Sequence, residues 1–199
     1  MKEFFPMVEI ERKTRETEVR LQLKLKGNGN TDIDTGIGFF NHMLELFAYH
    51  GFLDLALNVK GDLYVDEHHT VEDVGIVLGQ AISKAIGDRK GIRRYGDVTL
   101  PMDETLVQVV LDLGGRAYYQ DNLQYSREMV GDLPVELIEE FFRSLCNNAG
   151  MNLHILMHRG GNNHHLLEAC FKAFGRALDQ ALTYEERLGN KPLSTKGSL

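Results

Sequence analysis

The chain has 199 residues, 43% hydrophobic and 26% charged, which suits one large globular domain or two small ones and excludes extensive disorder. Its net charge of −7 argues against a nucleic-acid or membrane surface, although a few focused basic residues can still face a small anion. No apolar run approaches the ~18 residues of a membrane span, and Met1–Glu11 lacks the basic-then-apolar order of a secretory signal. We therefore expect a cytosolic protein, with Cys146 and Cys170 as reduced core residues.

Hydrophobic periodicity predicts alternating strands and helices. Apolar residues alternate with polar ones, as in half-buried strands, over 19–25, 53–59, 107–113 and 153–157. An opening strand is expected over Arg12–Glu18. Apolar residues spaced for one helix face predict helices over 39–49, 69–86, 135–147 and 165–184. The polar stretch 120–132 is expected to be a connection, and Gly189–Leu199 a tail without helix or strand.

An internal repeat relates the two halves of the chain. His68-His69-Thr70-Val71-Glu72 aligns with His164-His165-Leu166-Leu167-Glu168 at an offset of 96 residues, and Gly79 aligns with Gly175 in the same register. The repeat predicts a single unit of two similar halves, about 1–92 and 93–188, followed by the tail 189–199. Its fold class is α+β, with helices packed between two β-sheets.

The repeated H-H-x-x-E motif has the spacing of a metal-binding motif on one turn of a helix. If a helix begins near the histidines, imidazole and carboxylate project from one face within one turn. These ligands suit Mn, Fe, Co or Zn, and the lack of nearby thiolates disfavours a structural zinc site. A shift of about 98 residues also places Glu140 opposite His42. The eight candidate ligands are His42, His68, His69, Glu72, Glu140, His164, His165 and Glu168. A lone copy is commonly an exposed helix start, but two copies in register favour a metal.

Several other residues allow two interpretations. His50 lies about two helical turns after His42, so it either supports a metal site or lies at the surface. His154 and His158 lie on the polar face of a strand, where they line a site or meet solvent. Glu16 lies among basic residues and is either a catalytic base or an ordinary edge carboxylate.

Basic residues form a second candidate group. Arg94 and Arg116 lie in loops, and Ser194 and Lys196 lie in the tail. Lys172 follows Glu168 by one helical turn, while the equivalent residue of the first half is Ile76. A metal with nearby ammonium and guanidinium groups suits a small phosphorylated substrate. The alternative is a set of solvated loop charges and a frayed tail.

With these motifs, the chain closely resembles the imidazoleglycerol-phosphate dehydratase family of histidine biosynthesis. The likeness covers nearly the whole chain, through Arg12-x-Thr14-x-Glu16-Thr17, Phe39-Phe40-Asn41-His42-Met43-Leu44, Asp66-Glu67-His68-His69-Thr70-Val71-Glu72-Asp73, Gly91-Ile92-Arg93-Arg94-Tyr95-Gly96, Pro101-Met102-Asp103-Glu104, Asn163-His164-His165-Leu166-Leu167-Glu168-Ala169 and Ser194-Thr195-Lys196-Gly197. The resemblance implies a fold like that of ribosomal protein S5 domain 2, in an assembly of 24 subunits. It also implies two Mn²⁺ ions per active site, held between subunits.

The resemblance also implies roles for particular residues. Those that match the family's metal ligands are His42, His68, His69, Glu72, His164, His165 and Glu168. Many members have a histidine where this chain has Glu140; a carboxylate there can serve, but the adjacent Glu139 is an alternative. The matches to the family's phosphate contacts are Arg94, Arg116, Lys172, Ser194 and Lys196. Glu16 matches its acid/base carboxylate, and we expect Glu72, Glu168 and His50 as further catalytic groups.

The implied reaction removes water from imidazole glycerol phosphate to give imidazole acetol phosphate. Two other hypotheses remain open at this point. Paired metal ions also activate water, so the chain could be a dimetal hydrolase of a small phosphate ester. Alternatively, the chain could be no enzyme, and the histidines and glutamates could bind metal ions that only hold subunits together.

Overall fold

The computed structural model describes residues 5–197, so the first part of Met1–Glu11 and the end of Gly189–Leu199 lie outside the described residues. The first half consists of β1 (Val8–Lys13), β2 (Thr17–Lys24), β3 (Thr31–Asp34), α1 (Gly38–His50), β4 (Asp54–Gly61) and α2 (His68–Ile86). The second half consists of β5 (Tyr95–Met102), β6 (Thr105–Asp112), β7 (Tyr118–Asp121), α3 (Leu137–Ala149), β10 (Asn152–Arg159) and α4 (Asn163–Ala181). A short hairpin of β8 (Met129–Val130) and β9 (Leu133–Pro134) is added between β7 and α3, and the 3-10 helix η1 (Glu186–Leu188) follows α4.

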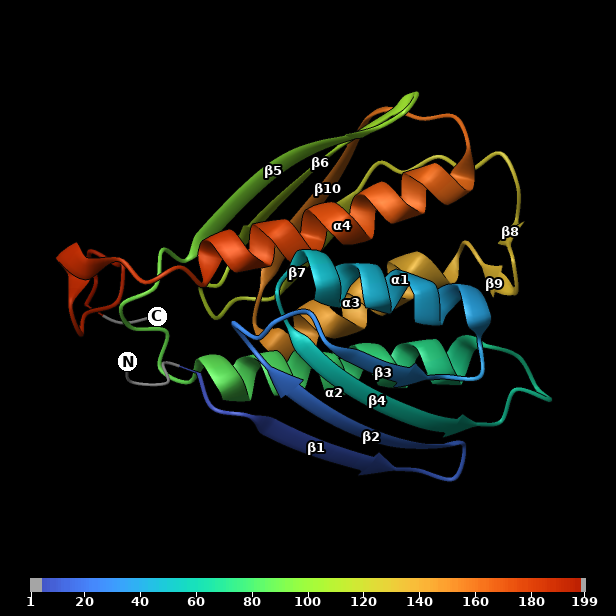
Figure 1. Cartoon of the computed structure of the whole chain (residues 1–199), viewed down its shortest axis with the longest axis horizontal. Coiled ribbons are helices and arrows are strands. Elements are labelled where there is room, and N and C mark those ends of the chain that lie inside the picture. Colours follow the sequence, from blue (N-terminus) through green and yellow to red (C-terminus); the bar gives the residue numbers. More distant parts are fainter. Residues whose placement is uncertain (1–4, 198–199) are drawn as a thin grey trace.

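The two halves have the same topology. The first sheet has the strand order β1-β2-β4-β3 and the second β5-β6-β10-β7, each with its last pair parallel and the others antiparallel. The helices lie between the two sheets (Figure 1). This architecture confirms the predicted α+β fold of two similar halves.

The strongly periodic segments are confirmed to within three residues at each end, but two polar segments were predicted wrongly. The segment Arg12–Glu18 is not one strand: β1 ends at Lys13, and β2 begins at Thr17. The Thr14 hydroxyl accepts the backbone N–H groups of Glu16 (3.1 Å) and Thr17 (2.9 Å), which closes a turn between them. The stretch 120–132 contains the end of β7, which pairs with the distant strand β10, as well as β8, which forms a local hairpin with β9.

The core fills the space between the sheets. The alternating strand residues turn Val19, Leu21 and Leu23 inward, where they are almost completely buried. Aromatic rings join the helices, and Phe47 of α1 stacks on Phe174 of α4 at 4.8 Å between ring centroids. The two cysteines are buried and unpaired, as the sequence predicts. Among residues 5–197, no helix is long and apolar enough to cross a membrane.

Glycines at equivalent positions allow the helices of the two halves to approach closely. A Cβ atom at Gly79 of α2 would lie 2.4 Å from the carbonyl oxygen of Leu145 in α3. A Cβ atom at Gly175 of α4 would lie 2.4 Å from the carbonyl oxygen of Phe47 in α1. The repeat therefore preserves these glycines because a backbone atom occupies the space that any side chain needs.

Gly79→Ala is expected to lower the free energy of unfolding by up to about 2 kcal/mol, because the new methyl group overpacks the contact between α2 and α3 at a cost towards the upper end of about 1–3 kcal/mol. The better helix propensity of alanine, about 1 kcal/mol, opposes this effect without cancelling it. Urea unfolding measures the difference, with Ser83→Ala on the same helix as the control. A variant as stable as the wild type would contradict the close-packing argument.

Candidate metal and phosphate site

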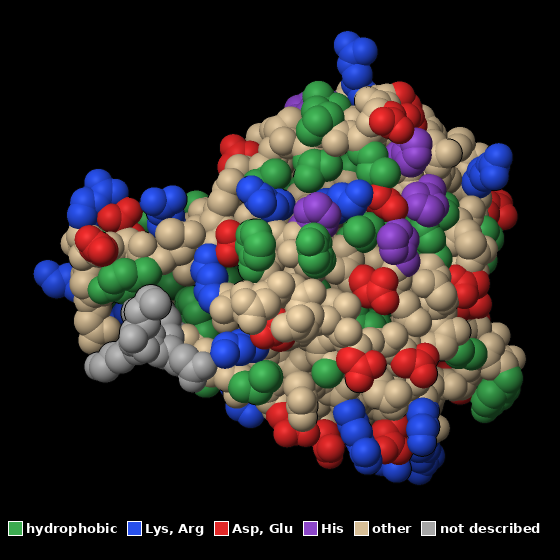
Figure 2. All heavy atoms as spheres, viewed as in Figure 1, with side chains coloured by type: hydrophobic (Ala, Val, Ile, Leu, Met, Phe, Trp, Pro, Cys, Tyr) green, Lys and Arg blue, Asp and Glu red, His purple; other side chains and the backbone are tan. Residues whose placement is uncertain are grey.

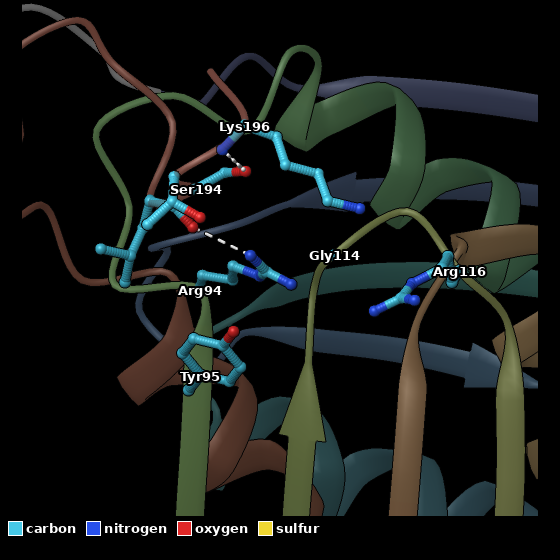
Figure 3. A pocket seen from close by; sticks show the side chains of 8 residues that line it. Arg94, Tyr95, Gly114, Arg116, Ser194 and Lys196 are labelled. Atoms are coloured by element: carbon cyan, nitrogen blue, oxygen red, sulfur yellow. Dashed lines mark hydrogen bonds between the residues drawn. The ribbon is translucent and has the colours of Figure 1, made fainter. Parts of the chain in front are cut away.

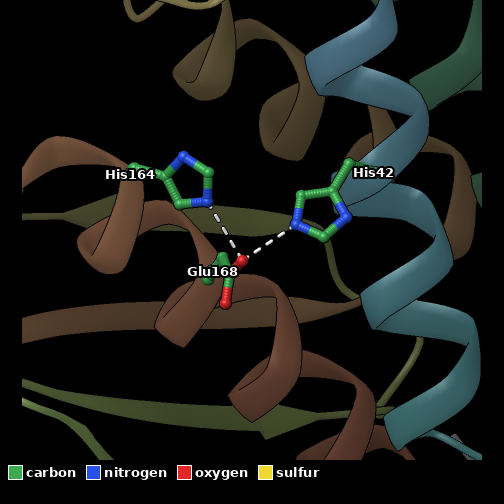
Figure 4. Close-up of side chains that lie close together, drawn as sticks. All are labelled: His42, His164 and Glu168. Carbon is green, nitrogen blue, oxygen red and sulfur yellow. Dashed lines mark hydrogen bonds and ion pairs between the residues drawn. The ribbon is translucent and has the colours of Figure 1, made fainter.

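Three predicted metal ligands meet where α1 packs against α4 (Figure 4). Nε2 of His42 lies 2.8 Å and Nε2 of His164 lies 3.1 Å from Oε1 of Glu168. The side chain of Asn162 caps α4 by accepting the backbone N–H of His164 at 2.8 Å. The helix therefore begins where the H-H-x-x-E spacing requires, and His164 and Glu168 face the same side. We call these three ligands the α1–α4 cluster.

The carboxylate of Glu168 is the electrostatic centre of this cluster. Its side chain is only 10% exposed, and its Oε2 accepts a hydrogen bond from Nζ of Lys172 at 2.5 Å. Burial opposes ionisation, but the hydrogen bonds from Lys172, His42 and His164 outweigh it and lower the pKa of Glu168 to about 2. Ligand atoms of the cluster all lie within 4.8 Å of one another. Two imidazole nitrogens and an ionised carboxylate form a donor set that fits a divalent transition metal.

The two histidines of each pair face different directions. The ring planes of His68 and His69 differ by 83°, and those of His164 and His165 differ by 87°. His69 and His165 are not members of the α1–α4 cluster; Nδ1 of each contacts a carboxylate elsewhere. Histidine side chains gather in one area of the surface, interspersed with charged side chains (Figure 2).

Glu16 lies beside one of these histidines. Its Oε1 atom is 3.9 Å from Nε2 of His69, although the two residues belong to different elements. Arg12 and Thr17, on either side of the turn that carries Glu16, both donate to the buried carboxylate of Asp73 in α2. This anchoring places an exposed carboxylate next to a candidate metal ligand.

The other predicted ligands are not brought together within one protomer. Among the described residues, His68, Glu72 and Glu140 belong to no group of three or more potential ligands. Glu140 accepts a hydrogen bond from Ser144 at 3.4 Å, while the neighbouring Glu139 is ion-paired with Arg143. Of the two candidates, Glu140 is the one that forms no ion pair with this arginine.

The remaining histidines lie elsewhere. Burial lowers the pKa of His50, and the positive charges of Lys172 and Arg176 lower it further, which favours a neutral imidazole near the cluster. His154 packs against Tyr118, with 5.5 Å between ring centroids. Nε2 of His158 lies 3.1 Å from the side-chain oxygen of Gln108.

Four of the five predicted phosphate contacts line one pocket of about 600 Å³ (Figure 3). This tail pocket is lined by Arg94, Tyr95, Gly114, Arg116, Leu193, Ser194, Thr195 and Lys196. Lys172 does not line this pocket; its ammonium group instead donates a hydrogen bond to Glu168.

Arg94 connects the tail to the second sheet. Its Nε and Nη2 atoms donate to the carboxylate of Asp112 at 2.6 and 2.8 Å, and its Nη1 donates to the carbonyl of Leu193 at 2.9 Å. The backbone N–H of Arg94 also bonds to the carbonyl of Ala181 at the end of α4. Because a helix rises about 1.5 Å per residue, this end lies about 25 Å along α4 from His164. The tail pocket and the α1–α4 cluster are therefore at opposite ends of that helix.

Sequence reasoning missed three carboxylates that form hydrogen bonds with predicted site residues. Asp62 contacts His69, Glu104 contacts His165 and Asp112 contacts Arg94. Glu104 belongs to the Pro101-Met102-Asp103-Glu104 motif, so a signal existed without an assigned role. Asp62 and Asp112 gave no such signal in the sequence, because neither belongs to a motif that also contains its partner.

These features define an α+β protein of two matching halves, with a histidine–glutamate cluster at one end of α4 and a basic pocket at the other. The chain matches the family model described as imidazoleglycerol-phosphate dehydratase over residues 35–178. It is 53% identical to the imidazoleglycerol-phosphate dehydratase of Acetivibrio thermocellus over 191 residues, 96% of this chain and 97% of that protein. The corresponding protein of Lachnoclostridium phytofermentans is 54% identical over 191 residues, again 96% of this chain and 97% of that protein.

Solved structures give the same result. The crystal structure of the dehydratase from Staphylococcus aureus superposes with a TM-score of 0.82 at 43% identity, covering 90% of this chain and 100% of that one. The structure from Pyrococcus furiosus gives a TM-score of 0.82 at 32% identity, covering 96% and 100%. The chain belongs to the imidazoleglycerol-phosphate dehydratase family, a family of hydro-lyases.

Proposed function

We propose that this protein removes water from imidazole glycerol phosphate to give imidazole acetol phosphate, a step of histidine biosynthesis. The observation that carries the proposal is the α1–α4 cluster, which two distant segments form in a chain of this family. The tail pocket, with two guanidinium groups and an ammonium group, fits the phosphate of such a substrate. The whole chain is proposed to act as one catalytic unit: the halves about 1–92 and 93–188 and the tail 189–199.

The donor set supports a divalent metal as cofactor. We propose Mn²⁺, two ions per active site, held by the eight ligands predicted from the repeat. A bound ion would polarise a ring nitrogen of the substrate and make the imidazole a better electron sink. The closeness of His42, His164 and Glu168 within one protomer supports their assignment as ligands of one ion.

The separation of the two sites supports an active site shared between subunits. The substrate's ring and phosphate are only a few bonds apart, whereas the α1–α4 cluster and the tail pocket lie about 25 Å apart along α4. One protomer therefore cannot hold both ends of the substrate with these two regions. We propose a cytoplasmic homo-oligomer, of 24 subunits as in the family resemblance, in which the tail pocket of one copy completes the metal cluster of another.

The proposed chemistry uses the imidazole ring in place of a carbonyl group. Glu16, or His50 as a neutral imidazole, accepts the ring N–H proton, and the ring electrons expel the hydroxyl on the adjacent carbon, which takes up that proton and leaves as water. The next carbon then loses its proton, the ring nitrogen regains one, and the resulting enol becomes the ketone. Glu72 and Glu168 are proposed to support these proton movements as well as to bind metal. Arg94, Arg116, Lys172, Ser194 and Lys196 fix the phosphate and so orient the ring.

A product assay tests the proposal directly. Purified protein is incubated with Mn²⁺ and imidazoleglycerol phosphate, and imidazoleacetol phosphate and free phosphate are measured separately. Formation of imidazoleacetol phosphate supports the dehydratase. Release of phosphate alone would indicate the dimetal hydrolase, for which the contact between Lys172 and Glu168 is the favourable observation. No turnover in an intact metal-loaded assembly would leave only the structural role.

Lys196→Ala is expected to raise KM about ten- to a hundredfold, because one charge-assisted contact to phosphate contributes about 1.5–3 kcal/mol. Metal content and folding should be unchanged, since Lys196 is exposed and lies outside the core. Steady-state kinetics with metal analysis measure both, and Lys191→Ala in the same segment is the control. Deletion of Ser194–Leu199 should have a larger effect in the same direction. Unchanged kinetics in the truncated enzyme would show that the tail does not bind phosphate.

A further inference from the structure

The second histidine of each pair is held by a carboxylate outside the repeated motif. We propose that Asp62 and Glu104 are positioning residues, which hold His69 and His165 with Nε2 available to a divalent ion. The inference rests on the proposed metal site and adds a role for two residues that the repeat does not contain.

The first contact lies between the end of β4 and the start of α2. Both carboxylate oxygens of Asp62 lie close to Nδ1 of His69, at 3.2 and 3.1 Å. The side chain of Asp62 is only 11% exposed, so the contact is sheltered from water. An ionised carboxylate only accepts hydrogen bonds, which places the imidazole proton on Nδ1 and leaves the lone pair on Nε2.

The second contact comes from a different element. Glu104 lies in the hairpin between β5 and β6, and its Oε2 is 3.1 Å from Nδ1 of His165. Its other oxygen accepts the backbone N–H of Asn162 at 2.7 Å, just before α4. The two oxygens of Glu104 are therefore both engaged, one by the backbone of Asn162 and the other by the ring of His165. One side chain thus fixes both the start of α4 and the ring of His165.

The repeat does not explain why both contacts exist. At the offset of 96 residues, Asp62 corresponds to His158, which contacts Gln108 instead. Glu104 is 61 residues before His165, whereas Asp62 is only seven before His69. Two halves that reach the same contact with carboxylates from different elements indicate a requirement of the site itself. A carboxylate on the distal nitrogen is the usual way in which a protein orients a metal-binding histidine.

Metal affinity distinguishes this role from a merely structural hydrogen bond. The full-length chain is freed of metal and titrated with Mn²⁺ by isothermal calorimetry, as wild type, Asp62→Ala and Glu104→Ala. We expect each variant to bind Mn²⁺ about 10- to 100-fold more weakly at the ion its histidine contacts. Asp97→Ala, an exposed carboxylate of β5 away from both histidines, serves as the control and should bind as the wild type does.

The amide variants supply a second measurement. Asp62→Asn and Glu104→Gln keep an oxygen that accepts the Nδ1 proton but lose the charge, so they should bind about fivefold more weakly than the wild type. They also keep the test decisive if an alanine variant fails to fold, which thermal unfolding of the metal-free protein reveals. Equal Mn²⁺ affinity in wild type and in the folded variants would overturn the inference. Absence of Mn²⁺ binding by the wild type would instead overturn the proposed metal site.

Discussion

Glu168→Gln is expected to lower kcat/KM by more than about 100-fold, equal to about 2.7 kcal/mol of transition-state stabilisation. The substitution keeps the shape of the side chain but removes the negative charge shared by His42, His164 and Lys172. The free energy of unfolding should fall by no more than about 3 kcal/mol, because the amide keeps an oxygen that accepts hydrogen bonds and loses only the contribution of the charge. Kinetics at saturating Mn²⁺ and urea unfolding separate the two effects.

The same helix offers a matched control. Asp179 of α4 is ion-paired with Lys26 at 2.6 Å, about 22 Å along the helix from His164, so Asp179→Asn removes an ion pair of the same helix without touching the cluster. It should lower the free energy of unfolding by about 1 kcal/mol or less, because this pair is partly exposed, and leave turnover unchanged. Glu72→Gln, in the other half, should lower activity as Glu168→Gln does, because neither copy substitutes for the other. Near-wild-type turnover in either glutamine variant would show that the two-metal proposal is wrong.

Chelation is expected to abolish activity and to dissociate the assembly. The α1–α4 cluster supplies three ligands, so a six-coordinate ion still has positions for ligands from elsewhere. If a neighbouring subunit provides some of them, removing the ion with EDTA removes a link between subunits as well as the cofactor. Sizing chromatography before and after chelation measures the assembly, and a product assay on the same fractions measures activity.

Adding metal back gives the control for this experiment. Mn²⁺ should restore both size and activity in the wild type, but only weakly in Glu168→Gln. A chelated sample that keeps its full size while losing activity would contradict the intersubunit placement of the metal and leave its catalytic role intact. A chelated sample that keeps its activity would contradict both.

Local patterns in the sequence determined much of the fold. The alternation over 19–25 and the helical spacing over 165–184 predicted β2 and α4, because a strand or helix that buries one face repeats its apolar residues at a fixed spacing. The repeat of H-H-x-x-E predicted two similar halves and the pairing of His164 with Glu168 across one helical turn. The turn at Thr14 was missed because a threonine side chain that accepts nearby backbone N–H groups leaves no mark in the hydrophobic periodicity. The strand β7 was missed because its parallel pairing joins it to β10, which is distant in sequence.

Only the tertiary structure decided which of the candidate residues lie together. The repeat offers two equivalent ligand sets, but the structure brings His42 to His164 and Glu168 and turns His165 away from them. It also places the tail pocket at the opposite end of α4 and puts Lys172 on Glu168 rather than in that pocket. Residue types and spacing along one helix specify which groups can bind a metal or a phosphate. Which of them converge depends on how helices and loops distant in sequence pack together, and adjacent residues such as His164 and His165 point to different sides of one helix.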